Sequence, residues 1–217
     1  MSAAGAMATS SHQSGRPGLS HVCKPVNANE DGVSKSCNLR PVAPKLRITN
    51  VISKAFLNCS LNLNDVEQKL PMAQYIPRRF SGLLLRVLQP IKAHCQLYSN
   101  GKMTVNGGSS VRQNRALAKR FTDQLVNIGY TCELSDYKVV NMVCSVDLQR
   151  KLPVEKIFHL LPSSSPNNDY SPELFPGLSV RMSGCTAVMF HSGKVNFLGC
   201  KTSTDAQAAY IDLQLYL

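Results

Sequence analysis

The sequence repeats itself once after about residue 46, and this duplication constrains the fold more than any other feature. Four markers recur in the same order at offsets of 91 to 95 residues: NVIS at 50–53 and NMVC at 141–144, FSGLLLR at 80–86 and FPGLSVR at 175–181, GKM at 101–103 and GKV at 193–195, and Gly107 and Gly199. Two copies of this length are too few and too long for a solenoid. We therefore expect two similar halves, 46–136 and 137–217, related by a pseudo-two-fold axis.

Both halves are predicted to contain a strand, a short helix, further strands and a second helix. In the first half we expect a strand at 47–53, a helix capped by Asn62 or Asn64 and ended by Pro71, strands at about 80–88, 93–99, 102–106 and 131–137, and a helix at 110–128. In the second half we expect a strand at 138–147, a helix at 153–161, strands at 178–182, 186–191 and 194–199, and a C-terminal helix. The predicted class is α+β, with an antiparallel sheet of about ten strands and helices on one face.

The helix at 110–128 is expected to be amphipathic. One side carries the apolar residues Val111, Leu117, Ala118, Phe121, Leu125 and Ile128. Basic residues lie along the same helix at spacings near three and four: Arg112, Arg115, Lys119 and Arg120. Two interpretations stay open for these: an ordinary solvated helix face, or a docking surface for acidic protein partners.

Charge and composition limit the class of function. The net charge is +11, which favours an acidic partner, with nucleic acid as the first candidate. The excess lies mainly in 46–136, which holds twelve basic and five acidic residues. Residues 1–45 are rich in Ser, Ala, Gly, Pro and Asn and lack aromatics, so we expect a disordered tail. No apolar run approaches the length of a membrane span.

Strand parity predicts one unusual sheet face. Residues two apart along a strand share a face, which groups the following side chains: Asn50, Ile52, Asn141, Val143, Gln96, Tyr98, Lys102, Thr104, Asn106, Val188, Phe190, Lys194, Asn196 and Leu198. None of them is a carboxylate. The residues alone leave two interpretations: a groove for nucleic acid, or a second core covered by another layer.

Four motifs resemble those of the TATA-box-binding protein family. They are YIPRRF at 75–80, SNGKM at 99–103, NMV at 141–143 and PELFPGL at 172–178. The resemblance covers about Leu46 to the end, nearly 80% of the chain. It implies a saddle-shaped sheet, with helices on the convex face, that sits on the DNA minor groove and bends A/T-rich promoter DNA. The family is itself the standard case of this mode of binding.

The resemblance also implies the DNA-binding residues. Four aromatic wedges correspond to Phe80, Tyr98, Phe175 and Phe190, with Tyr98 where the family has Phe. The central base-reading amides correspond to Asn50 and Asn141, flanked by Ile52 and Val143. Asn106 and Leu198 stand where the family has Thr, and Thr104 and Asn196 lie beside them. The basic positions near phosphates are Arg79, Arg86, Lys102, Arg181, Lys194 and Lys201.

The implied partners are initiation factors in the nucleus. Glu173 and Leu174 match the loop that meets TFIIB, while Ile76 replaces an Asn at the TFIIA edge and weakens that expectation. An alternative is a related interaction protein with weakened or lost TATA specificity, which Leu198 and Tyr98 favour. No enzyme, cofactor or metal site is expected, because five scattered His form no catalytic spacing and eight Cys form no C-x-x-C pair.

Overall fold

The computed structural model describes residues 45–161 and 168–217. The predicted disordered tail at 1–45 lies outside the described residues except for Lys45. The elements, in chain order, are β1 (Arg47–Phe56), α1 (Leu63–Lys69), β2 (Ala73–Tyr75), β3 (Leu83–Val87), β4 (Ala93–Leu97), β5 (Lys102–Gly107), α2 (Val111–Asn127), β6 (Ser135–Asp147), α3 (Val154–Leu160), β7 (Gly177–Met182), β8 (Cys185–Phe190), β9 (Lys194–Cys200), α4 (Ser203–Leu213) and the 3-10 helix η1 (Gln214–Tyr216).

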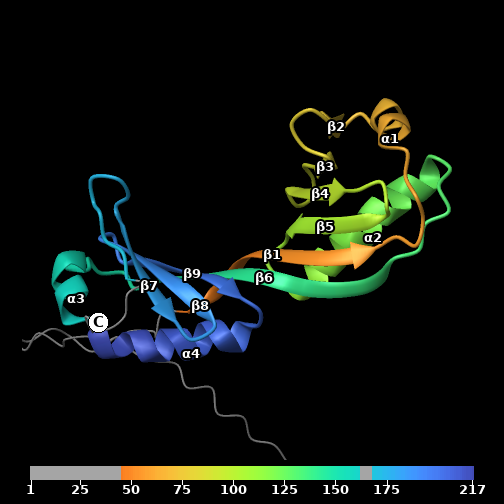
Figure 1. Cartoon of the computed structure of the whole chain (residues 1–217). Coiled ribbons are helices and arrows are strands. Elements are labelled where there is room, and N and C mark those ends of the chain that lie inside the picture. The colour runs from red at the N-terminus through yellow and green to blue at the C-terminus, as the bar shows by residue number, and fades with distance from the viewer. Residues whose placement is uncertain (1–44, 162–167) are drawn as a thin grey trace, which may run out of the picture. The chain divides into compact units, whose positions relative to one another are not determined.

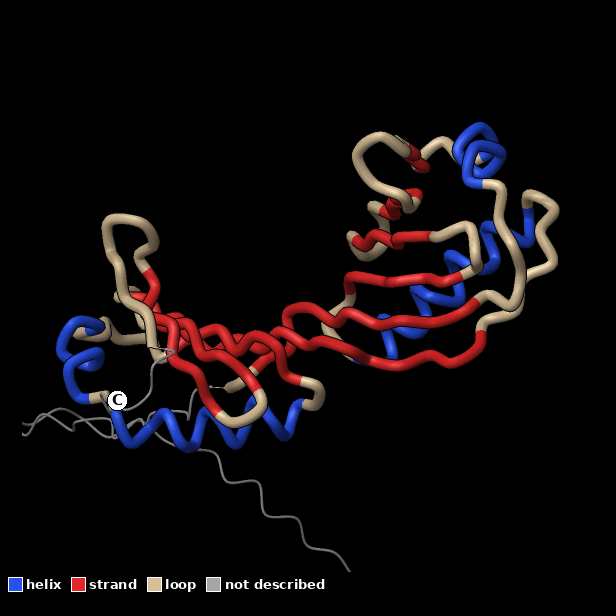
Figure 2. The backbone as a smooth tube through the Cα atoms, viewed as in Figure 1, coloured by secondary structure: helices blue, strands red, loops and turns tan. Residues whose placement is uncertain are grey.

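The described strands form one curved antiparallel sheet in the order β2-β3-β4-β5-β1-β6-β9-β8-β7. The two longest strands, β1 and β6, are neighbours at its centre, so each half of the sequence supplies one side of the sheet. The helix α2 packs on β5, β1 and β4, and α4 packs on β9, β8 and β6. Both lie on the outer side of the curve (Figure 1; helices blue in Figure 2). The predicted α+β fold with helices on the convex face is confirmed.

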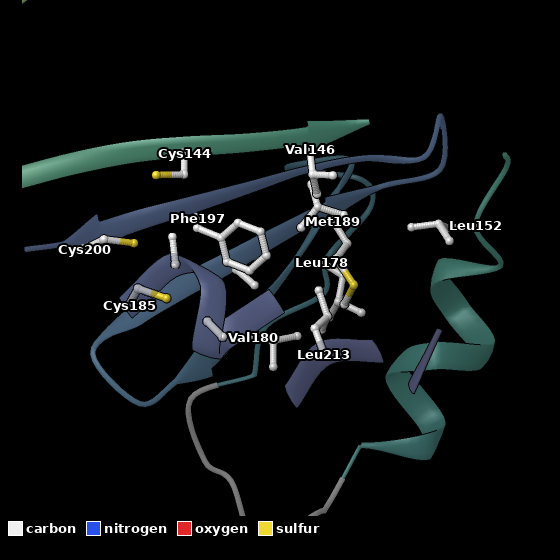
Figure 3. Close-up of a cluster of buried hydrophobic side chains, with 14 of the residues drawn as sticks. Cys144, Val146, Leu152, Leu178, Val180, Cys185, Met189, Phe197, Cys200 and Leu213 are labelled. Atoms are coloured by element: carbon white, nitrogen blue, oxygen red, sulfur yellow. The ribbon is translucent and has the colours of Figure 1, made fainter. Parts of the chain in front are cut away.

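Each half has its own hydrophobic core between sheet and helix. The first is centred on Phe121, Leu125, Leu57 and Leu97, and the second on Phe197, Met189, Leu178 and Leu213. Figure 3 shows the second core, where the thiols of Cys144, Cys185 and Cys200 join the apolar side chains. Burial and the neighbouring Cys200 raise the pKa of the Cys185 thiol to about 12. These thiols therefore act as neutral core filler at physiological pH.

The strand count differs from the prediction in ways that turns explain. Nine strands are described instead of about ten. The two strands expected at 131–137 and 138–147 form the single strand β6, because residues 131–134 connect α2 to it. The strand expected at 80–88 begins only at Leu83, since Phe80 N–H donates to Ile76 O (3.0 Å) in a turn. The short strand β2 was not expected, and an isolated bridge between Asp169 and Ser179 takes the corresponding edge of the second half.

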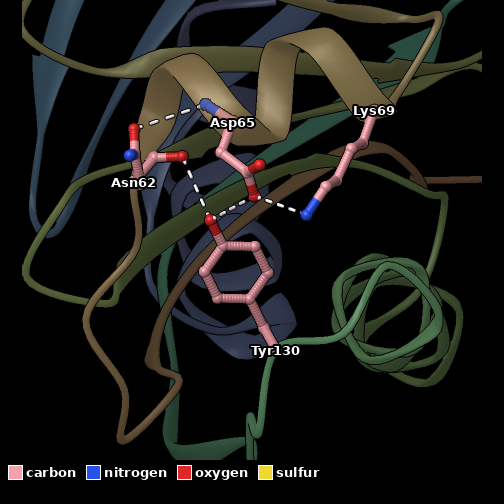
Figure 4. A network of polar contacts seen from close by, with 4 residues as sticks. All are labelled: Asn62, Asp65, Lys69 and Tyr130. Atoms are coloured by element: carbon pink, nitrogen blue, oxygen red, sulfur yellow. Dashed lines mark hydrogen bonds and ion pairs between the residues drawn. The ribbon is translucent and has the colours of Figure 1, made fainter.

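Asn62, rather than Asn64, caps the first helix, and the cap belongs to a polar network that ties the helix to a distant turn. The Asn62 Oδ1 accepts from the Asp65 N–H (3.3 Å). Asp65 also accepts from the Lys69 ammonium (2.9 Å) and the Tyr130 hydroxyl (2.8 Å), as Figure 4 shows. The Lys69 and Tyr130 hydrogen bonds hold the pKa of the Asp65 carboxyl below its usual value.

The apolar stripe of α2 differs from the prediction at its N-terminal end. Leu117, Ala118, Phe121 and Leu125 are buried as expected, but Val111 is 40% exposed. The fully buried residue of the first turns is Asn114. Its amide donates to Val51 O (2.8 Å) and Gly107 O (2.7 Å), and its oxygen accepts from the hydroxyls of Ser53 (2.5 Å) and Tyr137 (2.8 Å). A polar side chain is tolerated there because every polar atom has a partner.

Candidate nucleic-acid interface

The sheet face that carries neither α2 nor α4 is here named the open face. Burial alternates along each strand: Val51, Ser53 and Ala55 of β1 are buried against the helix layer, whereas Asn50 and Ile52 are half-buried on the other side. In β5 and β6 the same alternation places Lys102, Thr104, Asn106, Asn141 and Val143 on the open face. The grouping predicted from parity is therefore found for these seven residues, with no described helix packed over them, whereas Val188 of the predicted group is buried. This excludes, for the described residues, the interpretation of the face as a second helix-covered core.

The centre of the open face has near two-fold symmetry. In the ladder between β1 and β6, Asn50 lies opposite Val143, and Ile52 lies opposite Asn141. Each half therefore supplies one amide and one branched aliphatic residue, arranged diagonally. The Asn141 oxygen accepts from the Gly199 N–H (3.2 Å), and the NH₂ group of the same amide has no partner among the described residues. An NH₂ group without a partner suits ligands that offer acceptors.

Two rows of side chains run outward from this centre. The first row contains Asn141, Ile52, Asn106, His94 and Arg86, which are successive cross-strand partners. The second row contains Asn50, Val143, Leu198, Thr186 and Arg181, where Leu198 and Gly199 form the bulge opposite Val143. The rows have the same residue types at the first, second and last positions. A hollow of about 300 Å³ adjoins Asn50, His94 and Asn106.

A pair of aromatic rings lies at each end of the open face. Phe80 and Tyr98 meet edge to face with ring centroids 5.8 Å apart, and Phe175 and Phe190 also lie 5.8 Å apart. Phe80 and Phe175 are 40% and 48% exposed, which is unusual for Phe. Phe80 and Phe175 come from turns before β3 and β7, whereas Tyr98 and Phe190 come from the ends of β4 and β8. The sequence repeat thus appears as two matching exposed aromatic pairs.

The cations of the open face include two that were not predicted from the sequence. Lys54 and Lys138 are cross-strand partners on β1 and β6. Parity with Ile52 would have revealed Lys54, because it lies two residues further along the same strand. Arg86 donates to Gln74 Oε1 (3.2 Å), and Arg181 donates to Thr186 Oγ1 (3.3 Å), so both guanidinium groups are oriented. Burial, then the charge of Arg86, lowers the pKa of His94, which leaves this imidazole neutral at pH 7.

The remaining predicted phosphate contacts lie at margins. Arg79 is exposed in the turn that precedes β3, Lys194 is exposed at the start of β9, and Lys201 is exposed after its end. Acids with the open-face parity lie at the two ends of β6: Asp136 is two residues before Lys138, and Asp147 pairs in register with Lys194. The Asp147 carboxylate accepts from the Gln149 N–H (2.9 Å), which occupies it in a turn. Among the described rows, the centre of the face remains free of carboxylates.

The predicted partner-binding residues lie away from the open face. Arg112, Arg115, Lys119 and Arg120 are exposed on α2. The Arg115 guanidinium lies over the Tyr137 ring (5.5 Å to the centroid), and Arg120 donates to Gln89 O (2.6 Å). Glu173 and Leu174 form the turn before β7, where Leu174 is 88% exposed, and Ile76 is exposed in the corresponding turn of the first half. These residues therefore cannot contact a ligand seated on the centre of the open face.

Two other site types find no support in the part of the chain that the structure describes. No three His, Cys, Asp or Glu side chains there are grouped so as to hold a metal ion. None of the described helices has the length and apolar character needed to cross a membrane.

Comparison with known proteins gives a consistent result. The family model for "Transcription factor TFIID (or TATA-binding protein, TBP)" matches residues 45–128 and 136–214. TATA-box-binding protein-like 1 of Entamoeba histolytica is 28% identical over 208 residues, covering 90% of this chain and 94% of that protein. The TATA-box-binding protein of Xenopus tropicalis is 32% identical over 171 residues, covering 78% of this chain and 56% of that protein.

The solved structure of Methanococcus jannaschii TBP superimposes with a TM-score of 0.69 at 27% identity, covering 80% of this chain and 98% of that one. The match spans both repeats, the central strands and the aromatic turns described above. The chain therefore belongs to the TATA-binding protein family of transcription factors.

Proposed function

We propose that this chain binds A/T-rich promoter DNA in the minor groove with its open face, bends the duplex and recruits initiation factors in the nucleus. One observation carries the proposal: two matching exposed aromatic pairs flank a face whose centre holds two symmetry-related amides. Exposed rings at both ends of a carboxylate-free centre suit a ligand with stacked apolar surfaces and acceptor groups between them.

The chemistry of the minor groove matches these groups. A·T pairs present only acceptors there, adenine N3 and thymine O2. The NH₂ group of Asn141 can donate to such acceptors, and Asn50 holds the symmetric position. Rings inserted between base steps kink the duplex, because the lost stacking is offset by apolar contact with the protein. Arg86, Arg181 and the lysines at the margins would then face phosphates.

Protein partners would use the surfaces that the DNA leaves free. We expect TFIIB at the turn of Glu173 and Leu174, because the family resemblance implies this turn and Leu174 is exposed there for contact. TFIIA would meet the turn of Ile76, where an apolar residue changes the contact. The basic side chains of α2 suit further acidic factors. The role is that of a non-enzymatic platform that needs no cofactor or metal.

The test combines affinity with bending. Phe175→Ala with Phe190→Ala should reduce the bend of an A/T-rich duplex, measured by fluorescence resonance energy transfer between its ends at saturating protein. Affinity at low salt, measured by gel shift, should fall less than the bend, because phosphate contacts remain. Leu174→Ala is the matched control: it should leave bending unchanged and weaken TFIIB capture. Absence of binding at low salt, with and without TFIIA and TFIIB, would contradict the proposal.

A second candidate function is favoured by Leu198, which places an aliphatic side chain, 39% exposed, at the centre of the open face. Such a residue neither donates nor accepts, so a chain that binds initiation factors without TATA selectivity would tolerate it. Capture of TFIIB together with equal affinity for TATA and G/C-interrupted duplexes would support this candidate. A large affinity ratio in favour of TATA, at stated salt, would remove it.

A further inference from the structure

The two rows of the open face differ at their third and fourth positions, and the third lies nearer the centre. The third residue is Asn106 in the first row and Leu198 in the second, and these positions correspond in the duplication. Both side chains are partly accessible on the same face, and each lies beside the aliphatic residue of the central strand. The two rows therefore offer different hydrogen-bonding groups at corresponding positions.

The Asn106 side-chain amide can act either as a hydrogen-bond donor or as an acceptor toward a ligand. Among residues 45–161 and 168–217 it has no hydrogen-bond partner, whereas the Asn141 oxygen is occupied by the Gly199 N–H. By rotating about its last side-chain bond, Asn106 can present either its NH₂ group or its oxygen to a ligand. Leu198 can present neither. The first row thus adapts to donors and acceptors, and the second does not.

In the DNA minor groove, the difference between Asn106 and Leu198 predicts a difference in base selectivity. A G·C pair adds the guanine N2 amino donor to the acceptors that an A·T pair presents. Under Asn106 that donor can be accepted by the amide oxygen. Under Leu198 it would be buried without a partner, which carries the full cost of desolvating it.

We propose that the two halves read different base pairs: the Leu198 side of the bound site requires A·T, whereas the Asn106 side also accepts G·C. The inference rests on the proposed minor-groove function and refines the substrate class of that same site. It has a directional consequence. A duplex with one G·C pair near the centre binds in the single orientation that places the pair under Asn106.

Three duplexes test this without any measurement of orientation. The first has only A·T pairs, the second has one G·C pair on one side of the centre, and the third has a G·C pair at the symmetric position on both sides. The chain should bind the first two within about twofold, because one of its two orientations remains available, and the third about tenfold more weakly. Affinities are measured by gel shift or fluorescence anisotropy at one stated salt concentration.

Variants then assign the effect to the two residues. Leu198→Asn should bring the third duplex to within about threefold of the second. Asn106→Leu should weaken the second duplex about tenfold, since neither orientation then offers an acceptor. The double exchange, Asn106→Leu with Leu198→Asn, should restore the original pattern. Asn127→Leu, on the exposed side of α2, makes the same chemical change off the open face and should alter no ratio.

The possible failures are distinct. If the all-A·T duplex is not bound at low salt, the proposed function itself fails and the inference fails with it. The inference is wrong if the all-A·T duplex is bound but one G·C pair costs at least half of the binding free energy that two G·C pairs cost. In that case the two halves read base pairs alike. The inference is also wrong if Leu198→Asn leaves the ratio of the third to the second duplex unchanged while thermal melting shows the variant folded.

Discussion

Gly82 and Gly177 leave the space that the exposed rings of Phe80 and Phe175 occupy. A Cβ on Gly82 would stand 2.7 Å from Phe80 Cε1, and a Cβ on Gly177 would stand 2.5 Å from Phe175 Cε1 and 2.9 Å from Val188 Cγ1. Neither glycine needs a positive φ. Glycine is therefore required here for space, because each ring folds back over the residue two positions after it. This packing explains why an F-x-G pattern occurs in both halves, at 80–82 and 175–177.

Gly177→Ala should displace the Phe175 ring and test this role. The added methyl overpacks the site, so we expect a loss of about 1–3 kcal/mol in the free energy of unfolding, together with a smaller DNA bend. Urea denaturation and energy transfer across a labelled duplex measure the two effects. Gln207→Ala, exposed on α4 away from the open face, serves as the control and should change neither. An unchanged bend in a folded Gly177→Ala protein would show that Phe175 is not held by this contact.

At the scale of elements, the two halves anchor their long helices differently. In the first half, Asn114 of α2 joins the helix to β1, β5 and β6 through four hydrogen bonds. At the corresponding places of the second half, α4 has Ala206 and β6 has Cys144, both buried in the second core. One helix is thus held by a satisfied polar network and the other by apolar packing.

Asn114→Ala should therefore destabilise the first half strongly. It would remove a hydrogen-bond partner from two carbonyl groups and two hydroxyl groups, and a buried group left unsatisfied costs about 1–3 kcal/mol. We expect a loss of at least about 3 kcal/mol in urea denaturation. Ser53→Ala should cost less, and the double variant should cost less than the sum, because both residues share one network. Strict additivity would contradict the network, and Asn127→Ala on the exposed side of α2 provides the matched control.

The sequence predicted elements well where a period or a turn signal was long enough. From the apolar period the sequence placed α2, from the Asn-Gly turn it placed the first hairpin, and from the duplication it placed the second hairpin; it also predicted the antiparallel sheet. It missed β2, whose three residues pair only with β3 and carry no period of their own. It also assigned Val111 rather than Asn114 to the buried stripe of α2. Asn114 does lie on that stripe, but its burial depends on carbonyl groups from β1 and β5 that only the assembled sheet brings near.

For the whole molecule, the duplication predicted the open face better than the charge did. Asn50, Asn141 and the four aromatic residues were identified in matching pairs, and the structure places them symmetrically. Lys54 and Lys138 were missed because the prediction followed repeated markers, and the residue corresponding to Lys54 in the second half is Ser145. The DNA-binding roles of Asn50, Asn141, the four aromatic residues and the two lysines remain predictions. The juxtaposed pair Lys54 and Lys138 is itself informative, since like charges opposite each other on neighbouring strands are unfavourable without an anionic ligand.

The distribution of cations over the molecule predicts its salt dependence. Each phosphate neutralised by Lys or Arg contributes about −0.9 to the slope of log K against log salt. Lys54→Ala and Lys138→Ala should each make the slope about one unit shallower if they meet phosphates, with equal effects on A/T-rich and mixed duplexes. Lys119→Ala, exposed on α2, removes the same charge from the opposite side and should leave the slope unchanged. Slopes come from affinities at several salt concentrations. An equal change for Lys119→Ala would mean that net charge, rather than its position on the open face, governs binding.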